Sequence, residues 1–453
     1  MKFFNSQCFL DFEQAIWETD PELLVMDQIL DENPHIIKIA ASCFPNAHPE
    51  SQARVGRGGM TLEQVVRAAI YYRYKKLTFI ELSDKTIDSK KGRTFMKMKP
   101  NQYFSPQALQ ENIAKISTET LEKIHEAVVS YGIEIGVDNG QKMRTDSTAI
   151  ASNIRKPSNA SLLWDCIRVG YRLLDRTQKL LKIENYRCYQ KSAKKLFFKI
   201  VNTHKKEKRH PLFVRLIQSQ ERCQRQAFDA LKRLSKITFN DAQREKNRQK
   251  YVEALTDLLP KMQIVHDMAY RREILGEEVA VSDKIFSIFE DHTNCVVKGQ
   301  RDIIFGHKIN FASGKSNLIF DCIQELGNPS DSSYFSKTID NLNIKYNITP
   351  RDFAGDGGYA SKANLDYATA KGIVNIVFNK VKGSMKNIAS SPKMETMLKK
   401  WRAGMEAIIS NFKRGLDASR CPWKGWEHFK CFVLWNLITF NLRVISRYIL
   451  EKL

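Results

Sequence analysis

The feature that most constrains the fold is a change in the pattern of apolar residues near residue 281. From residue 158 to 280, apolar side chains recur at helical spacing almost without interruption. After that point, short β-branched and aromatic runs are interleaved with segments suited to helices. Such alternation is typical of an α/β sheet covered by helices. The expected strands are 281–291, 294–299, 305–313, 318–326, 352–361 and 372–380, and the expected helices are 330–344 and 361–372.

The second constraint is charge. The 453 residues include 72 Lys and Arg against 50 Asp and Glu, a formal net charge of +22. Between residues 186 and 250 there are nineteen basic and five acidic residues, so an excess of fourteen falls in one helical block. Charge of one sign favours contact with nucleic-acid phosphates over a merely solvated helix face. The candidate phosphate contacts are Lys194, Lys195, Lys205, Lys206 and Arg209.

Short helices are expected near the N-terminus. Thr61 suits the N-cap of a helix at 62–76, and Arg67, Arg73, Arg93 and other cations surround the helices and their tight turns. Over 56–135 this pattern suits a helix-turn-helix DNA-binding domain, with an ordinary basic helical bundle as the equal alternative. The expected helices after the first are 79–89, 107–117 and 120–134.

The two ends of the chain give less information. No function is predicted for residues 1–55. Near the C-terminus, the apolar run FVLWNLITFNL (432–442) is shorter than a membrane span requires. We therefore expect a core helix there and no membrane partner.

Two aspartates stand out by their local setting. Asp146 lies where a short strand would meet a turn. Asp356 ends the strand that begins the segment 352–361, in a turn built from Gly355, Gly357 and Gly358, where missing side chains allow a sharp bend and close approach of a ligand. Alone, Asp146 suits an Asx turn and Asp356 suits a purely structural turn.

A third acid, Glu406, lies in the segment 401–421, which we expect to be one helix. Arg402 and Lys413 stand four residues before and seven residues after Glu406, on the same helical stripe. Alone, Arg402 and Glu406 suit a surface i,i+4 ion pair. The neighbouring apolar stripe, expected to face a core, is Met405, Ile408, Ile409, Phe412 and Leu416.

Taken together, Asp146, Asp356 and Glu406 could meet at one edge of the sheet. Converging carboxylates repel one another strongly unless a metal lies between them. Hard oxygen ligands at an open site suit Mg²⁺, with Mn²⁺ as a substitute. Two such ions about 4 Å apart can activate an attacking oxygen and stabilise a leaving oxygen in phosphodiester chemistry.

These residues also carry a resemblance to a known family. TDSTAIASNIRKPSNASLLWDCIRVGYRLL resembles the first-aspartate region of ISNCY-type DDE transposases of bacterial insertion sequences. IFGHKINFASGKSNLIFDCIQELGNPSD followed by RDFAGDGGYAS resembles the second-aspartate region. Arg402, Glu406 and Lys413 match the R, E and K of the YREK signature, whereas Lys399 stands where its Tyr would be. The resemblance spans roughly residues 56–445.

The resemblance implies an α/β fold with a ribonuclease-H-like mixed sheet, flanked by helices and split by a long basic all-α insertion. Asp146, Asp356 and Glu406 would be the catalytic ligands of two Mg²⁺ ions, and Arg402 and Lys413 would contact DNA phosphates. Implied partners are the terminal inverted repeats and target DNA, bound by a homodimer in the bacterial cytoplasm. A nuclease without strand transfer and a non-catalytic DNA-binding derivative are the alternatives.

The predicted order is an N-terminal segment (1–55), a helical DNA-binding domain (56–135) and the first part of the catalytic core (136–157). A basic helical insertion (158–280) and the rest of the core with the C-terminal helices (281–453) follow.

Overall fold

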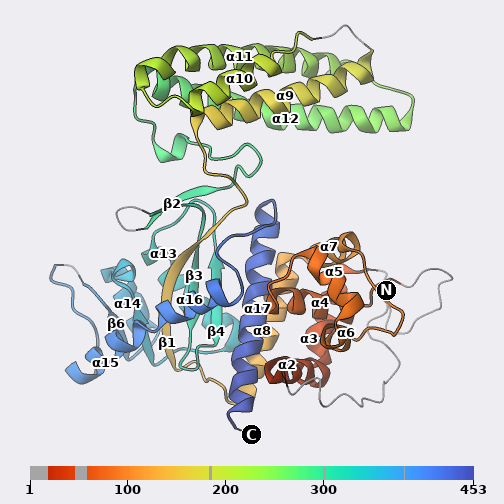
Figure 1. Cartoon of the computed structure of the whole chain (residues 1–453). Helices are drawn as coiled ribbons and strands as arrows, with labels where there is room; N and C mark the ends of the chain where they lie inside the picture. Colours follow the sequence, from red (N-terminus) through yellow and green to blue (C-terminus); the bar gives the residue numbers. More distant parts are fainter. Residues whose placement is uncertain (1–18, 46–58, 183–185, 299–301, 382, 453) are drawn as a thin grey trace. The chain divides into compact units, whose positions relative to one another are not determined.

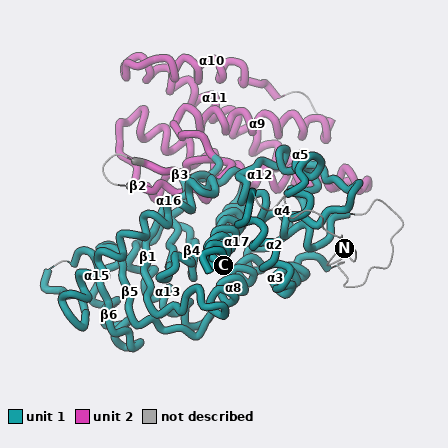
Figure 2. The backbone as a smooth tube through the Cα atoms, turned by 60° about the horizontal axis from the view of Figure 1, so that its bottom comes forward, with its two compact units in different colours: residues 1–153, 306–453 teal, residues 154–305 magenta. Residues whose placement is uncertain are grey.

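A computed structural model of the chain describes residues 19–45, 59–182, 186–298, 302–381 and 383–452. The predicted boundary between residues 55 and 56 lies outside the described residues. The chain divides into two compact units (Figure 2), one made of residues 1–153 with 306–453 and the other of residues 154–305. The second unit extends beyond the predicted boundary at residue 280.

A six-stranded mixed sheet has the order β2-β3-β1-β5-β6, with β4 also paired to β3 (Figure 1). The central strand β1 runs antiparallel to β3 and parallel to β5, and β5 runs parallel to β6. β4 is antiparallel to β3, and this arrangement is consistent with the expected ribonuclease-H-like sheet. The strands are β1 (Lys142–Ala151), β2 (Asn294–Lys298), β3 (Asp302–Ser313), β4 (Ile319–Gln324), β5 (Asp352–Gly355) and β6 (Asn375–Phe378).

Five of the six strands expected after residue 281 are present, and the two helices expected between them are confirmed. The strand expected at 281–291 is wrong, because this stretch contains only the short 3₁₀ helix η3 (Val281–Asp283). Its hydrophobic residues do not form a ladder because the backbone turns at Ser287. The Ser287 hydroxyl accepts hydrogen bonds from the amides of Phe289 (3.1 Å) and Glu290 (3.2 Å).

Helices cover both faces of this sheet. Asn310 and Phe311 are neighbours on β3, so their side chains point to opposite faces. Asn310 contacts Thr338 of α13, and Phe311 contacts Phe412 of α16, so these two helices lie on opposite faces. The helices after β4 are α13 (Asp331–Tyr346), η4 (Gly357–Tyr359), α14 (Lys362–Ala370), α15 (Pro392–Arg402), α16 (Met405–Gly415) and α17 (Trp426–Leu450).

The N-terminal helices form a layer that packs on α17 in the same unit. They are α2 (Pro21–Glu32), α3 (Pro34–Lys38), η1 (Ile39–Cys43), α4 (Leu62–Tyr74), α5 (Phe79–Asp88), α6 (Lys90–Phe95), α7 (Pro106–Ala114) and α8 (Thr118–Glu134). The predicted N-cap is confirmed, since Thr61 and Gln64 form a reciprocal capping box at the start of α4.

Helix α17 is the core helix that the C-terminal apolar run predicted, but the length argument was wrong. At 25 residues it is long and apolar enough to cross a membrane by length and composition. However, 83% of its most apolar window is buried inside the protein, where it packs against α8, α2 and α4. Its buried Asn441 accepts a hydrogen bond from the Ile319 amide (3.0 Å), which ties the helix to β4 inside the protein.

Three of the cations that suited either a DNA-binding domain or an ordinary basic bundle have structural roles. Arg67 is fully buried and forms ion pairs with Asp27, Asp31 and Glu63. Arg73 is also buried and donates to the side chain of Asn436 (2.9 Å). In the same layer, the guanidinium of Arg93 donates to four backbone carbonyls of its own and neighbouring turns. We therefore do not expect these three residues to contact DNA.

The second unit is built from four long helices, as predicted for residues 158–280. They are α9 (Asn159–Leu181), α10 (Gln190–Val201), α11 (Lys206–Ser235) and α12 (Ala242–Tyr270), followed by the π-helical turn η2 (Arg271–Leu275). Their apolar stripes meet in a separate hydrophobic core that includes Leu163, Ile167, Leu216 and Met262. We call this part of the chain, residues 154–305, the helical unit.

Candidate active site

Asp146 lies in the middle of β1, so the predicted position at a strand end is corrected. The strand continues to Ala151 because β3 pairs with it along most of its length, with Asp146 opposite Phe311. Alternation along the strand points Asp146 and Phe311 to the face covered by α16. The Ser147 amide donates to the Asp146 carboxylate at 2.8 Å.

Asp356 follows the last residue of β5, as predicted. Because β5 is parallel to β1 and pairs Gly355 with Thr145, this places the two aspartates at neighbouring positions of adjacent strands. Other parts of the chain approach this turn so closely that its glycines leave little room for a side chain. A Cβ on Gly358 would lie 2.8 Å from a carboxylate oxygen of Asp331, and one on Gly357 would lie 3.1 Å from the Lys380 carbonyl.

The segment that carries Glu406 is two helices rather than one, which corrects the predicted single helix at 401–421. Helix α15 ends at Arg402 and α16 begins at Met405. The guanidinium of Arg144 donates to the Trp401 carbonyl (2.6 Å) at the end of α15, and its carbon lies 4.6 Å from the Trp401 ring centre. The Gly404 amide donates to the same carbonyl (3.1 Å). Arg144 therefore caps α15 at the point where the chain bends.

We expect Gly404→Ala to destabilise the protein by about 1–3 kcal/mol, because overpacking a tight site costs this much. A Cβ at residue 404 would clash with the Arg144 guanidinium and would lie 3.3 Å from the Trp401 carbonyl oxygen. Urea unfolding would measure the change in the free energy of unfolding. Gly59→Ala is the control, since no atom of the described residues, its chain neighbours aside, lies within 4 Å of a Cβ placed there. Equal stability of the two variants would contradict the role given to Gly404.

The three predicted acids gather around one side chain, Arg402. Its Nη2 atom lies 2.6 Å from Asp146 Oδ2, and its Nη1 atom lies 3.6 Å from Asp356 Oδ1 and 3.7 Å from Glu406 Oε1. The Arg402 side chain is only 6% exposed, whereas those of Asp356 and Glu406 are 47% and 75% exposed. The guanidinium thus lies beneath the carboxylates, and two of these remain open to solvent.

Lys413, the other predicted cation, connects α16 to the sheet. Its ammonium donates to the Ala149 carbonyl of β1 at 2.5 Å. Four of the five residues of the predicted apolar stripe are buried, and Ile409 is partly buried. Phe412 packs against Phe311 at a ring-centre distance of 4.9 Å. Lys399, at the position of the missing tyrosine, forms an ion pair with Glu395 of its own helix (2.7 Å).

The donor chemistry of this cluster fits a divalent metal. Three carboxylates come within 4 Å of a single guanidinium, so they can approach one cation together. Carboxylate oxygens are the ligands that Mg²⁺ and Mn²⁺ prefer. Among the described residues, no three acidic, His or Cys side chains converge on a common metal position. Metal binding would therefore require the carboxylates to turn from Arg402 toward the ion.

Comparison with protein families adds the deciding observation. Residues 306–442 match the family described as transposase DDE domain. This part of the chain is a transposase DDE domain. No curated protein and no solved structure matches the chain.

The matched range of the DDE domain includes Asp356 and Glu406 but begins after Asp146. The structure connects Asp146 to the matched range, because β1 pairs with β3 and β5 of that range. The contact between Arg402 and Asp146 joins the same two parts of the chain. Asp146 therefore lies in the same sheet as the DDE domain, although 160 residues separate it from the start of the match.

Sequence reasoning missed Arg144 as a residue of this site. It stands two positions before Asp146, so the two side chains share one face of β1. Burial lowers the pKa of Arg144 to about 10, which leaves it charged at neutral pH. The available signal was the spacing of two residues between Arg144 and the candidate acid Asp146. It could not be used because the strand around Asp146 was expected to be short.

The helical unit carries the predicted phosphate contacts. Lys194, Lys195, Lys205 and Lys206 are exposed on α10 and at the start of α11. Arg209 is partly buried instead, with its guanidinium 5.4 Å from the Phe213 ring centre. The first four cations are therefore accessible to a polyanion, and Arg209 is held by packing.

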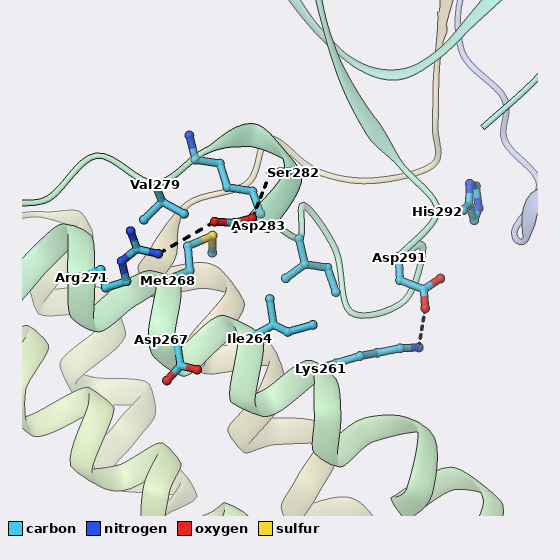
Figure 3. A pocket seen from close by; sticks show the side chains of 12 residues that line it. Lys261, Ile264, Asp267, Met268, Arg271, Val279, Ser282, Asp283, Asp291 and His292 are labelled. Carbon is cyan, nitrogen blue, oxygen red and sulfur yellow. Dashed lines mark hydrogen bonds and ion pairs between the residues drawn. The ribbon is translucent and has the colours of Figure 1, made fainter. Parts of the chain in front are cut away.

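A pocket of about 610 Å³ lies elsewhere in the helical unit (Figure 3). Its walls carry both signs of charge, and two of its cations are paired. Lys261 contacts Asp291 (2.9 Å), and Arg271 approaches Asp283 (3.9 Å). None of the predicted site residues lines this pocket.

Proposed function

We propose that the protein is an insertion-sequence transposase of the ISNCY type, which binds the terminal inverted repeats of its element, cleaves the DNA ends and transfers them to target DNA. The observation that carries the proposal is the gathering of Asp146, Asp356 and Glu406 around Arg402 on the sheet of a DDE domain. The match of Arg402, Glu406 and Lys413 to the YREK pattern supports the same assignment.

In this proposal the three carboxylates would hold two Mg²⁺ ions, with Mn²⁺ as a substitute. Bound there, the ions would activate the hydroxyl that attacks the phosphodiester and stabilise the leaving oxygen. Arg402, once released by the acids, would lie beside the ions with donors suited to a phosphate. Lys413 would hold α16, and with it Glu406, against β1.

The test uses duplex DNA that contains the two ends of the element, labelled on either strand, with a supercoiled plasmid as target. Incubation with the full-length protein and Mg²⁺ or Mn²⁺ should give cleavage at the ends and labelled products joined to the plasmid. Cleavage without joined products would favour a nuclease of the same fold. Binding without metal-dependent cleavage would favour a non-catalytic derivative.

The exposed cations of the helical unit give a separate prediction. Changing Lys194, Lys195, Lys205 and Lys206 to Gln should weaken DNA binding and lower the slope of log K against log salt by up to about 0.9 per lost phosphate contact. Fluorescence anisotropy over a salt series would measure this slope. Lys179→Gln is the matched control, because Lys179 is paired with Asp175 in the same unit (2.9 Å). An unchanged slope in the fourfold variant would contradict phosphate contact by this surface.

A further inference from the structure

A buried polar network lies on the sheet face opposite the carboxylates. Its centre is Asn310 of β3, whose side-chain oxygen accepts hydrogen bonds from Tyr359 Oη (2.5 Å) and Thr145 Oγ1 (3.0 Å). The Thr145 hydroxyl is shared with the Phe311 carbonyl, which also lies 3.0 Å away. The Asn310 amide nitrogen donates to Thr338 Oγ1 of α13 (3.1 Å). All four side chains are completely buried. A buried polar group without a partner costs about 1–3 kcal/mol, so each of these hydrogen bonds constrains the surrounding chain.

Two members of the network are close in sequence to the proposed metal ligands. Thr145 immediately precedes Asp146 on β1. Tyr359 ends the short helix η4, and its amide donates to the Asp356 carbonyl at 3.1 Å. The Asn310 oxygen thus joins the strand of the first acid to the turn of the second. Burial raises the pKa of Tyr359 well above its usual value, so its hydroxyl is a donor at neutral pH.

A second contact ties β1 to α13. Ser147, which follows Asp146, donates to Asp331 Oδ1 at 2.8 Å, and Lys308 pairs with the same carboxylate (3.2 Å). The other oxygen of Asp331 would lie 2.8 Å from a Cβ on Gly358, so α13 packs closely against the glycine turn. Asp146 therefore has an anchored residue on each side.

We propose that Asn310 is a positioning residue for the acidic cluster: it fixes the separation of Asp146 and Asp356 through its hydrogen bonds to Thr145 and Tyr359. The inference rests on the proposed function, because the separation matters only if both acids bind one metal centre. Residues that orient metal ligands typically contribute 10–100-fold to metal affinity or activity. No Asn310 atom needs to contact metal or DNA for this role.

Tyr359→Phe and Thr145→Val test the proposal, since each removes one hydroxyl and keeps the bulk of the side chain. Binding of Mn²⁺ to the folded full-length protein, without DNA, is followed by electron paramagnetic resonance. We expect each variant to bind Mn²⁺ about tenfold more weakly than the unaltered protein. Thr145→Ser, which keeps the hydroxyl, should restore the affinity.

Thr338→Val is the matched control. It leaves Asn310 without its partner on α13 and so costs similar stability, but it does not break the connection between the two acids. We expect its Mn²⁺ affinity to stay within twofold of the unaltered protein, and thermal unfolding would confirm that all variants are folded at the assay temperature. Equal weakening by Thr338→Val, or unchanged affinity in Tyr359→Phe and Thr145→Val, would overturn the positioning role.

Asp146→Asn separates this inference from the proposed function. If Mn²⁺ binding depends on Asp146 but not on the Tyr359 and Thr145 hydroxyls, only the positioning role fails. If Mn²⁺ binding is indifferent to Asp146, the metal centre itself is elsewhere, and both the proposed function and the role of Asn310 fall.

Discussion

Asp146→Asn is expected to reduce metal-dependent DNA cleavage by more than about 100-fold, because even a partner that only orients a metal ligand is worth 10–100-fold. The substitution keeps the size of the side chain and removes its charge. The ion pair with Arg402 and the proposed metal bond would both be lost. Cleavage of labelled element-end DNA in Mg²⁺ and in Mn²⁺ measures the effect, and Glu406→Gln should show the same loss.

Two comparisons make this result specific. Asp366→Asn changes an exposed carboxylate on α14 of the same domain and should cleave normally. DNA binding in the presence of EDTA should be retained by Asp146→Asn, because the phosphate contacts do not need the metal. Normal cleavage by a folded Asp146→Asn protein would remove Asp146 from the site, and the first acid would have to be sought elsewhere.

The second large effect is expected on stability and concerns Arg402. Arg402→Gln would remove the ion pair between Arg402 and the Asp146 carboxylate, which is only 16% exposed, and would take the positive charge away from the other two acids as well. Removing one partner of a buried ion pair costs about 3 kcal/mol, so the free energy of unfolding in EDTA should fall by about that much. Added Mn²⁺ should restore more stability to Arg402→Gln than to the unaltered protein, because it would replace the missing positive charge.

Thermal unfolding with EDTA and over a Mn²⁺ series measures both parts of this prediction. Arg402→Lys keeps the charge but loses the planar donors, and should lie between the other two proteins in EDTA. Because the Arg402 side chain is only 6% exposed, its loss should affect stability as well as catalysis. An Arg402→Gln protein as stable in EDTA as the unaltered one would contradict the role of Arg402 as counter-ion.

Local signals were sufficient for much of the fold. The capping box at Thr61, the glycine turn after β5 and the apolar stripe of α16 are all encoded within a few residues, and the structure contains each of them. The three acids were selected from their local settings together with the resemblance to DDE transposases, and they do meet around Arg402, although Asp146 lies within its strand and not at the strand end. Alternation of strand and helix signals after residue 281 was also sufficient to predict the α/β sheet.

The errors arose where a distant residue decides the local structure. The break between α15 and α16 depends on Arg144, which is 257 residues away in sequence from the carbonyl that it caps. The burial of Arg67 depends on Asp27 and Asp31, in a segment for which no role was predicted. Asn310 looked like an ordinary polar residue within a strand, because its three partners come from β1, α13 and η4.

The central position of β1 has a consequence for how the protein folds. Thr145 and Asn310 hydrogen-bond although they are 165 residues apart, so closing this part of the sheet carries a large entropic cost if the intervening chain is unfolded. The helices between them pack mainly on one another and can form first, which shortens the effective loop. During synthesis, β1 has no antiparallel partner until β3 emerges from the ribosome. The helical unit therefore determines when, during folding, Asp146 can come together with Asp356 and Glu406.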